Sequence, residues 1–176
     1  MRKDIRLLLP LIMITLGTSE TIAQEYFEVF ASEEISYPAY SEYYQDYNDP
    51  ENSKAFLASY YEGIFQYSTH NGLTIQDTIH LGSGYIKAID FEVLGSSNKE
   101  VLAVTTNERE VIIYDVNQKK VIYQTEVNYL LNDIQYSNVD PNILWGGDKR
   151  GQLVQINTAT KEIKYYPIHD MGIARI

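Results

Sequence analysis

The sequence repeats itself at a spacing of 42 to 47 residues. The segment "YDVNQKKVIYQ" at 114–124 and the segment "INTATKEIKYY" at 156–166 share one layout, in which a polar turn separates two apolar strands, and they start 42 residues apart. Tyr67 precedes the first of these segments by 47 residues and starts a related run. A repeat of this length is one supersecondary unit that buries its apolar surface only against neighbouring units. The chain is therefore predicted to fold as an array of similar units.

Each repeat contains four short runs with the composition of β-strands. Turn residues such as 95–98 and 107–108 separate the runs, and no window has a helical period. The predicted strands of two successive copies are 87–93, 101–105, 110–115 and 120–125, then 132–136, 143–146, 152–157 and 162–166. Four antiparallel strands in each repeat are typical of a β-propeller blade, a small twisted sheet that packs against its neighbours. The predicted fold class is all-β, a partial β-propeller of four-stranded antiparallel blades.

Two stretches resemble the YVTN and WD40-like propeller repeats: "VLAVTTNEREVIIYDVNQKKVI", which starts at Val101, and "LVQINTATKEI", which starts at Leu153. In both, an apolar third strand ends in Asp115 or Asn157, at the place of the Trp-Asp pair of WD40 repeats. The first copy has Ser68 at that place. The resemblance implies a propeller. The residue types themselves predict that the aspartate and the asparagine cap tight turns through hydrogen bonds to the backbone.

The resemblance covers residues 55–176, which is enough for about three blades, whereas closed propellers have typically 4 to 8. The last residues, 173–176, match the start of a blade's first strand and are expected to begin a further blade. The blades are therefore predicted to be an incomplete set. The remaining ones are expected either in a longer chain or in an oligomer of several copies.

Residues 1–23 have the pattern of a signal peptide. Positive charges open the chain, an apolar run of 10 residues follows at 7–16, and small residues at Thr21 and Ala23 suit a cleavage site. The alternative is a membrane anchor, but a spanning helix needs about 20 apolar residues. The chain also has no cysteine and so cannot form a disulfide. These features favour a secreted or periplasmic protein of a bacterial cell envelope, with no membrane insertion after signal removal.

Residues 24–54 form an acidic, tyrosine-rich segment that is expected to supply the first blade's first strand or a strap packed on it. Six tyrosines lie here, and an exposed recognition surface is the alternative role for them: Tyr26, Tyr37, Tyr40, Tyr43, Tyr44 and Tyr47. The stretch "QDYNDPEN" at 45–52 offers oxygen ligands of the kind that calcium binds, from Asp46, Asn48, Asp49 and Glu51. Pro50 breaks the EF-hand pattern, so a solvated loop is the favoured interpretation.

No catalytic signature is present in the sequence. His70, His80 and His169 have no metal-ligand spacing, and the "GSG" at 82–84 reads as a turn between blades rather than a nucleophile elbow. Trp145 lies in a predicted second strand and is expected to fill the space between sheets. No catalytic, cofactor-binding or metal-binding residue is therefore assigned, and no cofactor is expected.

The charge of the chain narrows the class of partner. The net charge is −10, and removal of residues 1–23 makes it −11. Such a surface repels nucleic acid and anionic lipid. The expected function is a secreted or periplasmic propeller that acts as a protein-interaction or ligand-binding scaffold, with a protein or peptide partner. The alternatives are a fragment of a propeller enzyme, of lactonase, lyase or glycosidase type, and a fragment of an extracellular sensor domain.

Overall fold

The computed structural model describes residues 38–70, 74–82, 84–94, 98–168 and 171–176. The predicted signal peptide, Tyr26, Tyr37 and His169 lie outside these residues. The described part forms three four-stranded antiparallel sheets and one 3₁₀ turn, η1 (Pro50–Asn52). The first sheet contains β1 (Pro38–Tyr44), β2 (Lys54–Ser59), β3 (Gly63–Ser68) and β4 (Thr74–Ile79). The middle sheet contains β5 (Ile86–Leu94), β6 (Lys99–Thr106), β7 (Glu110–Asp115) and β8 (Lys120–Glu126). The third sheet contains β9 (Leu131–Tyr136), β10 (Ile143–Asp148), β11 (Gln152–Asn157) and β12 (Ile163–Pro167).

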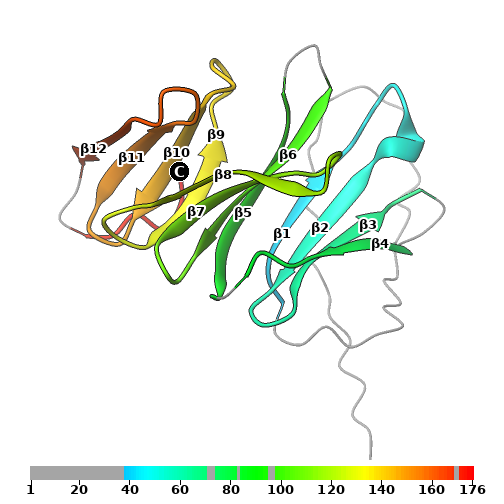
Figure 1. The fold of residues 1–176 in the computed structure, drawn as a ribbon, viewed down its shortest axis with the longest axis horizontal. Coiled ribbons are helices and arrows are strands. Elements are labelled where there is room, and N and C mark those ends of the chain that lie inside the picture. The colour runs from blue at the N-terminus through cyan, green and yellow to red at the C-terminus, as the bar shows by residue number, and fades with distance from the viewer. Residues whose placement is uncertain (1–37, 71–73, 83, 95–97, 169–170) are drawn as a thin grey trace, which may run out of the picture.

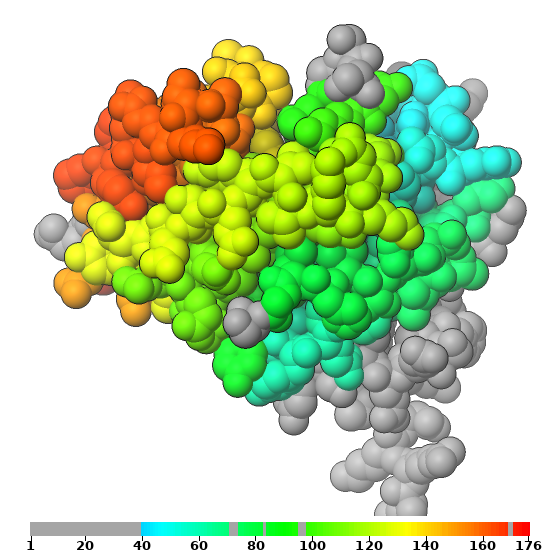
Figure 2. Space-filling model, viewed as in Figure 1, coloured from blue at the N-terminus to red at the C-terminus, as the bar shows by residue number. Residues whose placement is uncertain are grey.

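Each sheet is a meander in which strands that follow one another in the chain are also hydrogen-bonded neighbours. The sheets follow one another side by side, and the first strand of each lies beside the first strand of the next, so that β1, β5 and β9 are adjacent (Figure 1). The space-filling view shows the three units in chain order across the molecule, from cyan to orange (Figure 2). This arrangement, with sheets turned around a shared line of first strands, is that of propeller blades.

The strands of the second and third sheets lie within two residues of the predicted bounds. The repeat also extends to backbone geometry, because Lys119 and Lys161 (φ +52° and +65°), and Arg109 and Gly151 (φ +64° and +81°), take the left-handed conformation at spacings of 42. Residues 173–176 form no strand, and their role as the start of a further blade stays a prediction. A strand is defined by a hydrogen-bonded ladder with a neighbour, and among the described residues no further strand pairs with this segment.

The apolar core consists of two layers, one on each face of the middle sheet. Side chains alternate between the faces along a strand, so β6 sends Leu102 and Val104 toward the first sheet and Val101 and Ala103 toward the third. All four are fully buried. Burial of such side chains stabilises a fold by about 1.5–3 kcal/mol each for the larger ones. The middle sheet is thus the element on which both neighbours depend.

An ion pair also joins the first and middle sheets. Lys54 of β2 places its Nζ 2.5 Å from both carboxylate oxygens of Glu100 in β6, and little of either side chain is exposed. The backbone N–H of Glu100 in turn donates to the Asn117 side chain, at 2.8 Å. Because a buried charge without its partner is costly, this pair favours one alignment of the two sheets.

The predicted turn caps are confirmed. The Asp115 carboxylate accepts from the N–H of Gln118 at 2.8 Å, and Asn157 Oδ1 accepts from the N–H groups of Ala159 and Thr160 at 3.0 and 2.8 Å. In the first sheet, the equivalent hydroxyl of Ser68 accepts more weakly, at 3.3 Å from a backbone N–H. These side chains hold the turn between the third and fourth strands of each blade.

Trp145 does not lie in the core between the described sheets. Its neighbour Leu144 is fully buried between the middle and third sheets, whereas Trp145 points to the opposite face of the third sheet and is half-buried. There its ring lies 6.2 Å from that of Tyr166. The alternation of a strand allows only one of two successive residues to face a given layer. The third sheet therefore carries aromatic side chains on the face that points away from the middle sheet.

Replacement of Asp115 tests the capping role. Asp115→Ala removes the acceptor for the Gln118 N–H and the carboxylate beside Lys99 Nζ, at 3.6 Å, in a site that is almost fully buried. We expect a loss of about 2 kcal/mol in the free energy of unfolding, measured by urea denaturation. Asp115→Asn, which copies the residue found one repeat later, should cost less than half as much. Equal losses for the two variants would show that the cap contributes little.

Candidate interaction face

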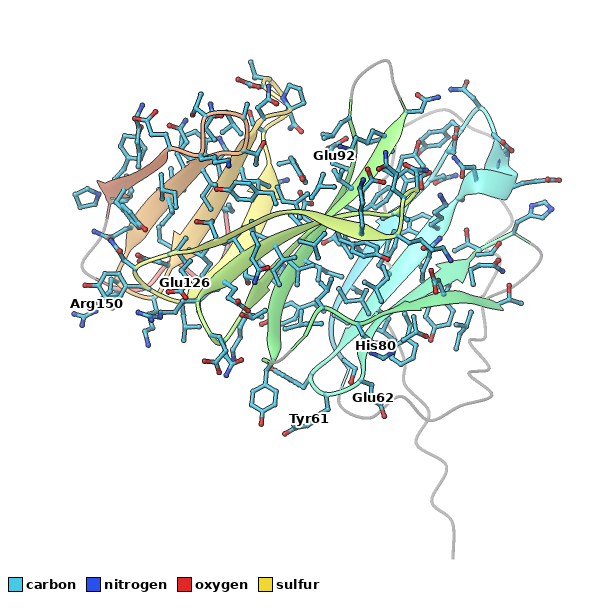
Figure 3. The ribbon with its side chains drawn as sticks, viewed as in Figure 1. Tyr61, Glu62, His80, Glu92, Glu126 and Arg150 are labelled. Atoms are coloured by element: carbon cyan, nitrogen blue, oxygen red, sulfur yellow. The ribbon has the colours of Figure 1, made fainter. Side chains whose placement is uncertain are left out.

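One face of the molecule collects the turns between second and third strands and the connections between sheets. We call it the connection face; it comprises residues 60–62, 80–82, 84–85, 107–109, 127–130 and 149–151. Hydrogen bonds bring its parts together: the N–H of Asn107 donates to the Tyr85 carbonyl at 2.8 Å, and that of Lys149 to the Leu130 carbonyl at 3.1 Å. Figure 3 shows Tyr61 and Arg150 along the same lower rim of the molecule.

A tyrosine cluster occupies the part of this face between the first and middle sheets. The ring of Tyr61 meets that of Tyr85 edge-on, with centroids 5.0 Å apart, and Tyr60 lies 6.4 Å from both. Lys87 Nζ lies 5.6 Å from the centre of the Tyr60 ring. Tyr61 is 64% exposed and Tyr85 44% exposed, so ring surface faces solvent. Exposed tyrosines in a rigid group are typical of surfaces that bind other proteins.

A hollow of about 390 Å³ continues the face toward the third sheet. Its cations are Arg109 from the β6–β7 turn and Lys149 and Arg150 from the β10–β11 turn, and its one acidic side chain is Glu108. Arg150 places its guanidinium 5.1 Å from the centre of the Tyr129 ring. Among the residues that the structure describes, none of these three cations has an acidic oxygen within 4 Å. We call this site the basic hollow.

Carboxylates gather along the adjacent first strands. They are Glu42 of β1, Asp90 and Glu92 of β5, and Asp133 of β9. Burial, followed by the charges of Asp90 and Asp133, raises the pKa of Glu42 to about 7, against a lowering by Arg175. Burial also raises the pKa of Asp90 to about 6, although the N–H of Tyr136, which donates to it at 2.6 Å, lowers it.

Two of these carboxylates accept backbone hydrogen bonds from the segment that lies beside their strand. The N–H of Tyr136 on β9 donates to Asp90 of β5, and in the same way the N–H of Ile176 donates to Asp133 of β9, at 2.9 Å. The side chains of Ile173 and Ile176 pack over Gly147 of β10, where a β-carbon would lie only 2.5 Å from Ile173. The C-terminal residues therefore lie along the third blade, although they form no strand.

His70, His80 and the glycine turn lie beside turns, as the sequence predicts. His70 lies at the start of a loop, 3.7 Å from Glu51, and His80 follows β4. Within the described residues, no group of three or more histidine, aspartate or glutamate side chains could hold a metal ion. Gly82 and Gly84 have positive φ angles of +95° and +123° in the connection to β5, as a turn requires, while Ser83 lies outside the described residues.

The loop at 45–52 is held by its own hydrogen bonds. Asp46 Oδ1 accepts from the N–H groups of Asn48 and Asp49, at 2.9 and 3.0 Å, and these bonds lower its pKa. The tyrosines around it divide by strand face: Tyr40 packs on the core and Tyr44 lies 5.2 Å from the Phe91 ring, whereas Tyr43 and Tyr47 are 58% and 83% exposed. Asp46 therefore stabilises the turn.

The connection face is the feature that sequence reasoning missed. Its residues belong to no motif, and they are separated by more than 80 positions, from Tyr61 to Arg150. A signal was nevertheless present, because the turns at 60–62, 107–109 and 149–151 occupy the same place in successive repeats. Superposition of the repeats would have placed their side chains on one face, together with the connections between blades.

No protein-family profile matches the sequence, and no curated protein matches it. Among solved structures, the fold is similar to that of Sqt1 from Saccharomyces cerevisiae, a WD40 propeller protein, with a TM-score of 0.61 and 18% sequence identity. This similarity and the three four-stranded antiparallel sheets fit the fold of a partial WD40-like propeller. The match covers 78% of this chain and 37% of Sqt1. At this identity the similarity concerns the fold alone. The described residues also contain no helix long and apolar enough to cross a membrane.

The raised pKa of Glu42 predicts how stability depends on pH. Between its usual pKa of 4.5 and about 7, folded Glu42 holds a proton that the unfolded chain releases, so the free energy of unfolding falls as pH rises through this range. Glu42→Gln should therefore stabilise the protein by roughly 1 kcal/mol at pH 8, after allowance for water screening, and very little at pH 4. Urea denaturation at both pH values measures this. Exposed Glu126, mutated to Gln, is the control, and an equal gain at both pH values would contradict the prediction.

Proposed function

We propose that this protein is a protein-interaction scaffold that binds its partner through the connection face. The observation that carries the proposal is the continuity of that face, where the tyrosine cluster and the basic hollow meet at Tyr85 and Asn107. Rings and cations of this kind dominate the binding energy of protein interfaces. Hydrogen bonds hold two turns of this face in place, because Ser59 Oγ accepts from the N–H of Tyr61 and Asp148 Oδ1 accepts from the N–H of Arg150. Such preorganisation reduces the conformational entropy that is lost on binding. A propeller fold does not determine function, so the proposal rests on this surface.

We propose further that additional blades pack against the third sheet. Its outer face presents Trp145, Leu153 and Tyr166, which are the residue types that fill the layers between blades. The Asp90–Tyr136 hydrogen bond between first strands is repeated by Asp133 and Ile176, so the last residues already follow the path of a next blade. Such a blade comes from a longer chain or from another copy.

Export to the periplasm or the cell exterior is also part of the proposal. It is supported by the sequence of residues 1–23, with its basic start, apolar run and small residues at Thr21 and Ala23. The absence of cysteine from the chain fits a bacterial envelope, where many proteins are stable without disulfides.

A photo-crosslinking experiment tests the interaction face. The photoreactive residue p-benzoylphenylalanine replaces Tyr85 on the connection face or, as a control, Tyr47, which is 83% exposed in the β1–β2 loop at the other end of the strands. We expect a discrete crosslinked partner from position 85 in the native host and none from position 47. Equal crosslinking at both positions, or none at position 85, would overturn the proposed face.

The intact mass of the protein purified from its native host tests the other two parts. Export predicts a mature N-terminus at Gln24, and a mass that includes residues 1–23 would contradict it. Further blades predict either a chain heavier than residues 24–176 or a closed oligomer of that chain. A stable monomer with the mass of residues 24–176 alone would refute the additional blades.

A further inference from the structure

The basic hollow has a charge opposite to that of the protein around it. The chain has 24 acidic and 14 basic side chains, yet the hollow holds Arg109, Lys149 and Arg150 against Glu108 alone. The Asn107 side-chain amide donates to that glutamate at 3.1 Å, so part of its acceptor capacity is already used. A local cationic site on an acidic surface attracts anionic groups that the rest of the molecule repels.

Among the described residues, the three cations of the hollow form no ion pair, whereas four of the eight other cations do. Lys54, Lys99 and Lys119 each form an ion pair, with Glu100, Asp115 and Asp77 respectively. These pairs lie toward the opposite face or on the outer strands. In the hollow, by contrast, Arg150 lies over the Tyr129 ring, with its guanidinium carbon 5.1 Å from the ring centre. A guanidinium held in this way suits bidentate binding of a carboxylate.

The ring surface beside the hollow extends the site in one direction. Tyr85 lies next to the hollow through Asn107, whose side chain accepts from the Tyr85 N–H at 2.5 Å, and the ring of Tyr61 lies 5.0 Å further along. A small anion would use only the hollow. An extended peptide would place carboxylates in the hollow and its other side chains on the tyrosines, because aromatic rings bind apolar side chains and peptide groups.

We propose that the basic hollow binds an acidic peptide segment of the partner protein. This inference rests on the proposed function, because it assigns the chemistry of the ligand to the same connection face. A nucleic acid would also present anions, but its phosphates would follow the surface beyond the hollow, where the net charge of −10 opposes it. An acidic peptide needs only the few cations that the hollow provides.

Fluorescence anisotropy with a short fluorescein-labelled peptide of alternating glutamate and serine tests the proposal. The purified protein should bind this peptide at low ionic strength and release it as salt is added, and it should not bind the matching peptide of alternating lysine and serine. The double substitution Lys149→Glu with Arg150→Glu should raise the Kd at least about tenfold, since it reverses two of the three cations.

The matched control reverses two cations on the other side of the molecule. Lys120 is the first residue of β8, and Lys161 lies in the turn between β11 and β12. Neither has an ion pair in the described structure, and their replacement by glutamate gives the same change in net charge. This variant should retain the Kd of the original protein to within about twofold. An equal loss in both variants would show attraction by net charge and would overturn the site, provided both variants unfold at the same urea concentration as the original.

Two other results also overturn the inference. Tighter binding of an oligothymidylate than of the acidic peptide, lost in the Lys149→Glu with Arg150→Glu variant, would make the hollow a nucleic-acid site. Binding of the lysine peptide, or of neither peptide, would show that the hollow is not a site for an acidic peptide. Crosslinking from position 85 distinguishes these failures from failure of the proposed function, because a partner still captured there would show that the face is correct and the chemistry of the ligand wrong.

Discussion

The middle sheet is apolar on both of its faces, and the rest of the structure depends on this. A four-stranded sheet with two apolar faces cannot be stable in water by itself, so it requires a sheet on each side. The alternation along β6 sends Val101 and Ala103 to one layer and Leu102 and Val104 to the other. The first and third sheets meet this requirement, and the Lys54–Glu100 pair fixes the alignment of one interface.

The repetition brings carboxylates of neighbouring first strands close together, which lowers stability. The first strands lie side by side, and they bring Glu42, Asp90 and Asp133 toward one another. Their carboxylates are partly satisfied by the N–H groups of the next first strand, as for Asp90 with Tyr136. Burial raises the pKa of both Asp90 and Glu42, and for Glu42 no donor among the described residues offsets this rise as the Tyr136 N–H does for Asp90. The carboxylates of the first strands thus help to align the blades, and they also lower the stability of the fold at neutral pH.

The architecture could be predicted from the sequence because it depends on local pattern. Strands and turns at a fixed period specify four-stranded units, and Asp115 and Asn157 specify the turn between the last two strands. It was harder to predict which face of its sheet an individual side chain occupies. Trp145 and Leu144 are both large and apolar, and their order decides which one enters the core, but the sequence alone does not set the phase of the alternation. The connection face depends on distant turns such as those of Tyr61 and Arg150, and no local pattern reports their proximity.

The capped turns explain why the connection face can carry function without loss of the fold. At the ends of two of the second strands, β2 and β10, a polar side chain holds the turn: Ser59 Oγ accepts from the N–H groups of Tyr61 and Glu62, at 3.3 Å each, and Asp148 Oδ1 accepts from the N–H groups of Arg150 and Gln152, at 2.8 and 2.9 Å. The backbone is satisfied by these caps, so the outward side chains of the turn residues contribute little to stability. Equivalent turns of different repeats can therefore present tyrosines in one blade and cations in another. Together these turns form one surface with two kinds of chemistry.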